Sequence, residues 1–472
     1  MYPAQTSFIP IQVALARFLE SQGWRAFFQN YPYWYLGTTP FRYLTGPILP
    51  SWLVLFHKLL PSFNFFSLFW LLIAAVWPLG TTGVYLLVRN LKPDNRNLAI
   101  LAAVFYFFGP IVPFLFRFSG GLSLIAFSFL PYVLLLYNKF LAKPSRKRAI
   151  YCVFAIAFEI LTDSVIMTSM LLGMAAIFLA TCGWKRAEKK IKQTLGVVAT
   201  AFLAATVWYT PQYWWQILIA PSFAGKPLFK VVGELAQLLP IGLAVGLAVV
   251  SGRVVKTKDK LLKFCFYWLF IFGFLTLIRF LSDPDFWLDW SAYSWELQLG
   301  GAMAMGLLMK KLKRKYLTLP IFLFYFCLFV FVSKQYVLAT LQRDISQTVE
   351  YRIGEQLTKV IKPSEKVFLS GTTVFWLNAF SASWRIAQVR GGNDRASVDP
   401  EWRQAAWELR EGKKVEKSIE YLKKLGIAYI VVHTQESEEF YHDFVYPEKF
   451  EENKELEKIY DKNGDRIYQL LD

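Results

Sequence analysis

The stretch Ala149–Cys182, AIYCVFAIAFEILTDSVIMTSMLLGMAAIFLATC, decides the fold, because it is long enough for one membrane-crossing helix or for two short ones. A single crossing places the basic cluster at 185–192 across the membrane from the earlier basic clusters. A break at Leu161-Thr162-Asp163-Ser164 instead restores a regular alternation of basic loops and loops with few basic residues. We therefore predict two short helices that meet at Asp163.

Apolar stretches fill the first two-thirds of the chain on both sides of this break. The composition is 55% hydrophobic and 18% aromatic, which is typical of a membrane protein rather than a soluble one. We predict a mainly α, polytopic transmembrane helical bundle of about ten spans, each near the length that a bilayer requires. The predicted spans are 63–88, 98–116, 121–141, 149–162, 164–182, 194–217, 231–251, 261–280, 295–309 and 316–336.

Lys and Arg are concentrated in every second gap between the predicted spans. The gaps with most Lys and Arg, holding 3, 5, 5, 5 and 5, are 89–97, 139–148, 183–193, 252–263 and 310–315. The opposite gaps, holding 1, 0, 2 and 1, are 117–120, 162–164, 218–230 and 279–294. Lys and Arg stay on the cytoplasmic side of short loops, so the first set is predicted to be cytoplasmic. Both termini then lie outside a multi-pass cell-membrane protein.

The net charge of +18 does not indicate nucleic-acid binding. Residues 340–472 carry a net charge of −3, and the rest of the chain carries +21 in short loops beside apolar runs. Such loops are explained by membrane orientation, whereas a nucleic-acid-binding protein presents its basic side chains as one surface. We predict no nucleic-acid partner.

The predicted bundle, 63–339, is flanked by two other regions. Residues 1–62 are expected to form an amphipathic helix at 7–22 on the outer membrane surface, followed by an interfacial loop. A partly buried connecting helix at 7–22 is the alternative. Because an exported N-terminus with no preceding anchor is unusual, we expect an initial transmembrane helix to be missing.

The last region, 340–472, is predicted to be a small extracytoplasmic α/β domain. Short apolar runs there alternate with amphipathic segments. The predicted strands are 366–370, 427–433 and 466–471, and the predicted helices are 403–410 and 418–425.

Acidic residues are rare before position 340, where only eleven occur. Glu159 and Asp163 are four residues apart in an apolar run, and ionisable groups at membrane depth are costly and often functional. Both are therefore catalytic candidates. The alternative is structural, with Asp163 capping the following helix and Glu159 pointing into the bundle.

The outer loop 279–296 carries a second candidate site. Asp283, Asp285 and Asp289 supply oxygen ligands for a divalent cation, Mg²⁺ or Mn²⁺, and Arg279 suits a phosphate at headgroup depth. The alternative is an acidic outer face with an aromatic belt of tryptophans, which needs no bound ligand.

Other outer segments supply weaker candidates. Lys226, in an aromatic loop, and Arg117 are candidate phosphate or substrate contacts. An interfacial anchor is the favoured interpretation of the aromatic loop. Arg390, Asn393 and Asp394 are weak candidates for an acceptor site, and a Gly-Gly turn stabilised by Asn and Asp is the alternative.

The chain resembles the polytopic GT-C-type glycosyltransferases, which use polyprenyl-phosphate-linked sugars. It resembles more narrowly the bacterial and archaeal membrane proteins called 6-pyruvoyl-tetrahydropterin synthase-related. The stretches that carry the resemblance are Pro32–Tyr43, Leu161–Asp163, Trp208–Trp214, Pro221–Lys226, Phe375–Asn378 and Arg390–Asp394.

The resemblance implies transfer of a sugar, as by a hexosyltransferase, from a polyprenyl-phosphate donor to an unknown acceptor on the outer face of the membrane. In the family an outer-loop carboxylate activates the acceptor hydroxyl, and a cation or an Arg assists the leaving phosphate. The family's usual acid in the first outer loop has no counterpart here, where Ala4-Gln5-Thr6-Ser7 stands. The alternatives are a non-catalytic GT-C-like protein in envelope polysaccharide assembly, or a lipid or sugar transporter.

Overall fold

The computed structural model divides the chain into two compact units. One comprises Met1–Leu68, Tyr209–Gly225 and Leu341–Asp472, and the other comprises Phe69–Trp208 and Lys226–Thr340. The predicted division into 1–62, 63–339 and 340–472 stays a prediction. The structure describes residues 2, 5, 9–29, 31, 46–110, 113, 121–163, 166–182, 187–209, 239–252, 257–282, 293–311, 315–335, 344–362, 364–381, 384–390, 400–451 and 453–471.

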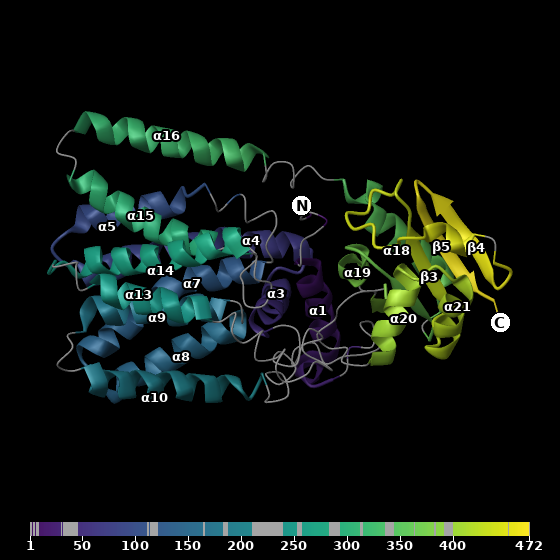
Figure 1. Cartoon of the computed structure of the whole chain (residues 1–472), viewed down its shortest axis with the longest axis horizontal. Helices are drawn as coiled ribbons and strands as arrows, with labels where there is room; N and C mark the ends of the chain where they lie inside the picture. The colour runs from purple at the N-terminus through teal and green to yellow at the C-terminus, as the bar shows by residue number, and fades with distance from the viewer. Residues whose placement is uncertain are drawn as a thin grey trace. The chain divides into compact units, whose positions relative to one another are not determined.

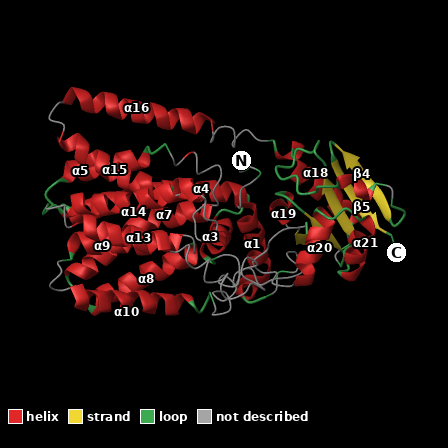
Figure 2. Ribbon diagram, viewed as in Figure 1, coloured by secondary structure: helices red, strands yellow, loops and turns green. Residues whose placement is uncertain are grey.

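The second unit is a bundle of helices that run alongside one another (Figure 1, Figure 2). Its helices are α4 (Phe65–Leu91), α5 (Arg96–Phe107), α7 (Gly121–Ala142), α8 (Arg146–Thr162), α9 (Ile166–Thr181), α10 (Ala187–Ala205), α13 (Leu239–Gly252), α14 (Lys260–Ser282), α15 (Ser294–Lys311) and α16 (Lys315–Ser333). The first residues of α4, up to Leu68, belong to the first unit. Within the bundle α14 contacts α9, α13 and α15, while α8 contacts α7 and α10. Aromatic rings join α16 to α5, as in the edge-to-face pair Phe105–Tyr325 at 5.2 Å between ring centroids.

The bundle is apolar on its outside as well as inside. Leu203, Phe280 and Phe324 are 69%, 79% and 72% exposed, although they sit in otherwise apolar helices. Large exposed apolar faces of this kind suit a lipid environment. Among the described residues three helices are long and apolar enough to cross a membrane, Phe65–Leu91, Ser123–Ala142 and Lys260–Leu281. The predicted number of ten spans stays a prediction.

The predicted break between two short helices at Asp163 is confirmed. Helix α8 ends at Thr162 and α9 begins at Ile166. Between them Asp163 has an extended backbone, with φ −151° and ψ 117°, so the helix cannot continue through it.

Two predicted spans have different bounds in the structure. Helix α5 ends at Phe107 instead of reaching 116, because Pro110 follows closely and Gly109 lies against Gln298. Helix α10 begins at Ala187 and ends at Ala205, so it takes in basic residues that were assigned to the preceding gap.

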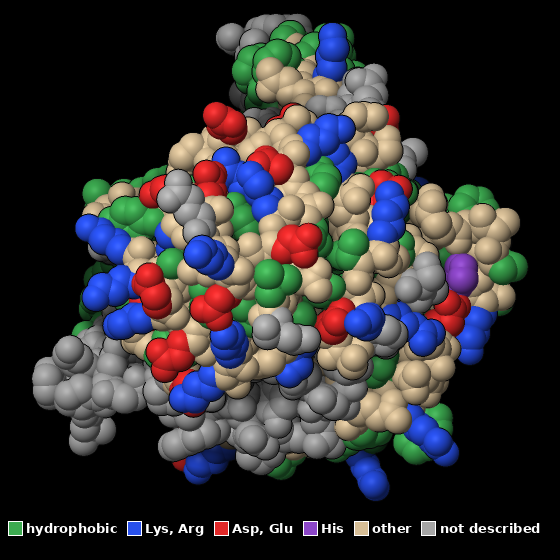
Figure 3. Space-filling view, turned by 90° about the vertical axis from the view of Figure 1, so that its right-hand side faces the viewer, with side chains coloured by type: hydrophobic (Ala, Val, Ile, Leu, Met, Phe, Trp, Pro, Cys, Tyr) green, Lys and Arg blue, Asp and Glu red, His purple; other side chains and the backbone are tan. Residues whose placement is uncertain are grey.

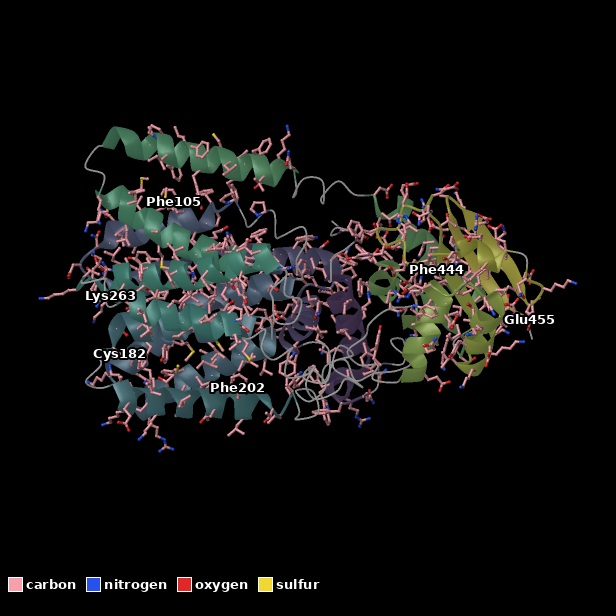
Figure 4. All side chains as sticks on the ribbon, in the orientation of Figure 1. Phe105, Cys182, Phe202, Lys263, Phe444 and Glu455 are labelled. Atoms are coloured by element: carbon pink, nitrogen blue, oxygen red, sulfur yellow. The ribbon has the colours of Figure 1, made fainter. Side chains whose placement is uncertain are left out.

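The helix ends that flank the basic connections lie together at one end of the bundle, on the left in Figure 1. Two of the connections are joined by an ion pair between Lys92 and Asp259. Figure 4 places Cys182 and Lys263, which border two of these connections, at the same end. Helix α8 starts at this end with Arg146, so Asp163 at its other terminus belongs to the opposite end.

The first unit contains α1 (Ile9–Gln22), η1 (Gly23–Phe27) and α3 (Ile48–Leu59). Helix α1 packs against α3, α19 and η5. Its residues Ile9–Ala16 are all buried, including Gln12 at 3% exposure. A helix lying on a membrane surface keeps one polar face in water, so this burial favours the alternative of a connecting helix.

The remainder of the described first unit is an α/β domain. Its strands are β1 (Lys366–Leu369), β2 (Ala387–Arg390), β3 (Tyr429–His433), β4 (Leu456–Lys462) and β5 (Asp465–Leu470). Its helices are η4 (Ile345–Gln347), α18 (Val349–Val360), α19 (Thr373–Trp376), η5 (Leu377–Ala379), α20 (Pro400–Arg410), α21 (Val415–Lys424) and η6 (Pro447–Phe450). The three predicted strands and two predicted helices are confirmed, whereas β2, β4, α18 and α19 were not predicted.

The sheet has the order β2-β1-β3-β5-β4. Strand β1 pairs in parallel with β2 and β3, and β5 pairs antiparallel with β3 and β4. Buried side chains such as Phe368, Leu422 and Phe444 form its core. In Figure 4 Phe444 lies inside the domain while Glu455 points outward. Figure 3 shows acidic and basic side chains interspersed over the domain's surface, as expected for a face in water.

Candidate active site

Asp163 occupies the break between α8 and α9 and is 8% exposed. Its Oδ2 accepts a hydrogen bond from Ser123 Oγ on α7 at 2.6 Å. Its backbone N–H donates to the carbonyl oxygen of Glu159 at 3.0 Å, which closes the last turn of α8. The carboxylate is therefore held by two neighbouring helices at a bundle end.

Glu159 lies one turn earlier on α8 and is fully buried. Among the described residues neither of its carboxyl oxygens has a hydrogen-bond partner. Asp163 and Glu159 are close enough to interact electrostatically. A buried, unpartnered carboxyl group costs stability, so its retention here favours a function over a purely structural role.

Glu296 is a third interior carboxyl group, at a position where the predicted outer loop 279–296 and the predicted span 295–309 overlap. It stands in the first turn of α15 and is fully buried. Its Oε1 accepts a hydrogen bond from Ser169 Oγ of α9, and its backbone carbonyl accepts one from Trp268 Nε1 of α14 at 2.6 Å. The signal in the sequence was its position directly before an apolar run, where an acidic residue suits a helix N-terminus.

Tyr106 of α5 connects the interior carboxyl groups. It is fully buried and interacts electrostatically with Glu159 and Glu296. Its ring stacks on Trp77 at 4.7 Å between centroids, and its carbonyl oxygen accepts a hydrogen bond from Gln298 Nε2 at 3.1 Å. Within the described part of the chain its hydroxyl has no partner. Polar side chains from several helices thus converge beneath Asp163.

The other predicted site residues are not brought into this cluster by any described contact. Arg279 lies in the last turn of α14 and is half-buried. Arg390 ends β2 in the other unit. Outside the described residues lie Asp283, Asp285, Asp289, Lys226, Arg117, Asn393 and Asp394.

A divalent-cation site is not formed by the described residues. No group of three or more His, Cys, Asp or Glu side chains is placed there to hold a metal ion. Among the described residues Glu159 has no hydrogen-bond partner, and Asp163 accepts a hydrogen bond from a serine hydroxyl. The predicted Mg²⁺ or Mn²⁺ ligands lie in the loop outside the described ranges, so we derive no step through a metal.

Two histidines are paired with carboxyl groups in the structure. His57 Nδ1 contacts Glu20 Oε1 at 2.6 Å, and His433 Nδ1 contacts Asp465 Oδ1 at 2.8 Å. Ser437 donates to the same Asp465 oxygen, so serine and histidine share the carboxylate and do not contact each other as in a hydrolytic triad.

The fold matches solved membrane glycosyltransferases. The arabinofuranosyltransferase AftD from Mycobacteria superposes with a TM-score of 0.56 at 13% identity, covering 100% of this chain and 41% of that protein. A mutant of AftD gives 0.57 at 14% identity, covering 100% and 40%. The oligosaccharyltransferase of Archaeoglobus fulgidus gives 0.50 at 13% identity, covering 92% and 66%.

This chain thus spans 41% of the length of AftD and 66% of the oligosaccharyltransferase. No protein-family model matches it, and no curated protein matches it either. The narrower resemblance to the 6-pyruvoyl-tetrahydropterin synthase-related proteins therefore stays a prediction. At these identities the comparison establishes the architecture: the chain has the fold of the GT-C-type membrane glycosyltransferases.

Proposed function

We propose that the chain is an integral membrane glycosyltransferase that moves a sugar from a polyprenyl-phosphate donor to an acceptor on the outer face of the membrane. The observation that carries the proposal is the break at Asp163. Within a GT-C-type bundle it holds one carboxylate, bound by Ser123, at the end opposite the basic connections. The matched proteins transfer arabinofuranose or oligosaccharide, as their names state, which supports the reaction class.

Asp163 serves in this proposal as the general base. It takes the proton of the acceptor hydroxyl while the acceptor oxygen forms a bond to the anomeric carbon of the sugar. The bond between that carbon and the phosphate oxygen breaks, and polyprenyl phosphate leaves with the electron pair. The hydrogen bond from Ser123 orients the carboxylate, and the 8% exposure of Asp163 limits competing water.

The interior cluster of Glu159, Tyr106 and Glu296 fixes the positions of the helices at this end of the bundle. Glu296 ties α15 to α9 through Ser169 and to α14 through Trp268. Arg279 ends α14 at the same end of the bundle as Asp163, because α14 starts at the basic end with Lys260. Its guanidinium suits the leaving phosphate, since Arg binds phosphate oxygens in a planar, two-pronged geometry.

The direct test is sugar transfer by the purified chain in liposomes. Radiolabelled undecaprenyl-phosphate mannose, glucose and arabinofuranose serve as donors, and solubilised cell-envelope glycans serve as acceptors. Asp163→Asn is expected to lower transfer about 100-fold or more, the usual effect of removing a general base. The matched control is Asp94→Asn, an exposed aspartate at the basic end of the bundle, which is expected to leave transfer unchanged.

Each outcome decides between functions. Equal transfer by Asp163→Asn and the parent chain removes Asp163 as the base. No transfer by the parent chain from any of the donors, with the protein folded, favours the non-catalytic GT-C-like protein in envelope assembly. Membrane orientation is tested separately by labelling intact cells with an impermeant maleimide, in which Asp94→Cys is expected to be protected and Glu457→Cys to react.

A further inference from the structure

A pocket of about 70 Å³ lies between α1 and the residues 378–381 and 384–385, all in the first unit. Its lining combines cationic, amide, hydroxyl and aromatic side chains: Arg17, Ser21, Tyr31, Asn378, Trp384 and Arg385. None of these residues is a candidate from the sequence analysis, and none belongs to the cluster around Asp163. The pocket is a separate site within the unit that carries the α/β domain.

Arg17 is a half-buried cation whose charge is not neutralised by an acidic group in the described residues. Two of its five N–H groups donate to backbone carbonyls, Nε to Ala379 at 3.1 Å and Nη2 to Phe380 at 3.3 Å. The guanidinium also stands over the ring of Phe65, at 5.3 Å from its centroid. These contacts fix the side chain without cancelling its charge.

The nearest acid along α1 is committed elsewhere. Glu20 contacts His57 Nδ1 at 2.6 Å and forms no ion pair with Arg17. Burial lowers the pKa of the Arg17 guanidinium, and Glu20 and Tyr2 only partly offset that effect. A guanidinium that has lost water and gained no counter-ion is stabilised when an anion binds beside it.

The rest of the lining suits a sugar. The Trp384 ring packs edge-to-face against Phe380, with 5.4 Å between the ring centroids. It also packs directly against Gly354, so the ring is fixed. Asn378 is also fixed, since its side chain donates to the carbonyl oxygen of Ile386 and accepts from the Ile386 N–H, both at 3.1 Å. Rigid aromatic and amide groups beside a cation favour a polar ring that carries a negative charge.

We infer that this pocket binds the acidic terminal sugar of a glycan, with its carboxylate on Arg17 and Arg385 and its ring against Trp384. A volume of about 70 Å³ accommodates one acidic end of a ligand. The inference names the acceptor class for the proposed glycosyltransferase and rests on that function only in calling the ligand an acceptor. Binding itself does not depend on it.

The test measures binding to the purified full chain, without a donor. The probes are a cellobiose-type disaccharide ending in glucuronic acid and the same disaccharide ending in glucose. The acidic probe is expected to bind at least 10-fold more tightly than the neutral one. Arg17→Gln is expected to weaken the acidic probe at least 10-fold and leave the neutral one unchanged.

Two further variants separate binding from folding. Arg385→Gln removes an exposed cation at the pocket and is expected to weaken the acidic probe at least 3-fold without lowering stability. The matched control is Arg25→Gln, an exposed arginine in the neighbouring η1 that does not line the pocket and is expected to change nothing.

The results distinguish this inference from the proposed function. Equal binding of both probes, or no effect of Arg17→Gln and Arg385→Gln on the acidic probe, overturns the acidic-sugar pocket even if sugar transfer is observed. Displacement of the acidic probe by undecaprenyl phosphate in micelles also overturns it, because the pocket then holds a lipid phosphate. Selective binding of the acidic probe in a chain that transfers no sugar supports the pocket and contradicts the enzyme.

Discussion

Gly300 of α15 allows close packing of α15 against α14, and its replacement by alanine tests that packing. A Cβ at Gly300 would lie 2.6 Å from Trp268 Cδ1 and 2.7 Å from Leu269 Cδ2, closer than carbon atoms approach without displacement. The Trp268 ring is fully buried and meets Gly173 of α9 on another side, where an added Cβ would lie 2.7 Å from Cζ3. The ring therefore has no free space into which it can move.

The neighbouring Gly301 is the matched control, because a Cβ there would meet nothing within 4 Å. Both substitutions gain the same helix propensity, about 1 kcal/mol. Their difference therefore isolates the overpacking cost, about 1–3 kcal/mol for one methyl group in a full core. At about 2–4 °C per kcal/mol, Gly300→Ala is expected to melt about 2–12 °C below Gly301→Ala.

The assay is thermal unfolding in mild detergent with a thiol-reactive dye. Cys152 and Cys265 are buried in the bundle, whereas Cys327 is exposed and Cys182 is partly exposed. With Cys182→Ser and Cys327→Ser in all variants, the dye reports the opening of the bundle. In a Trp268→Phe background the gap between the two variants is expected to shrink, since the smaller ring leaves room for the methyl group. A Gly300→Ala protein that melts at or above Gly301→Ala would refute the packing described for α9, α14 and α15.

Two further predictions concern the α/β domain. Burial lowers the pKa of Lys449 in the folded domain to about 8, so the folded state disfavours the charged form. The unfolded chain keeps the Lys449 proton to higher pH, so the free energy of unfolding is expected to rise between about pH 8 and 10.5. In urea titrations at several pH values, Lys449→Met is expected to reduce this rise of the unfolding free energy with pH. An unchanged rise contradicts the lowered pKa of Lys449. Glu439 is buried and accepts four hydrogen bonds from the N–H and hydroxyl groups of Thr372 and Thr373. Glu439→Gln leaves donors unsatisfied and is expected to cost about 2–4 kcal/mol in the same titrations, while the exposed Glu436→Gln is expected to cost less than about 0.5 kcal/mol.

The candidate site could be predicted only in part from the chain. Asp163 and Glu159 were identified because two carboxyl groups in an apolar run are conspicuous in the sequence. Glu296 fell where the predicted loop 279–296 and the predicted span 295–309 overlap, since its neighbours Trp295 and Leu297 fit either a loop edge or a helix start. The Arg17 pocket gave no signal, because the guanidinium meets carbonyl groups more than 360 residues away.

Local pattern therefore determined the elements. Apolar runs of near-bilayer length specify helices, the Thr162-Asp163-Ser164 break ends one of them, and short apolar runs specify β1, β3 and β5. Strands β2 and β4 were not predicted; β4 keeps only Leu456 buried, so its sequence lacks the apolar run of a core strand. Tertiary structure alone decided which polar groups meet, as with Glu296 and Ser169 or Arg17 and Ala379. The physical reason is that periodicity records how much of one element is buried, whereas partnership depends on how separate elements pack together.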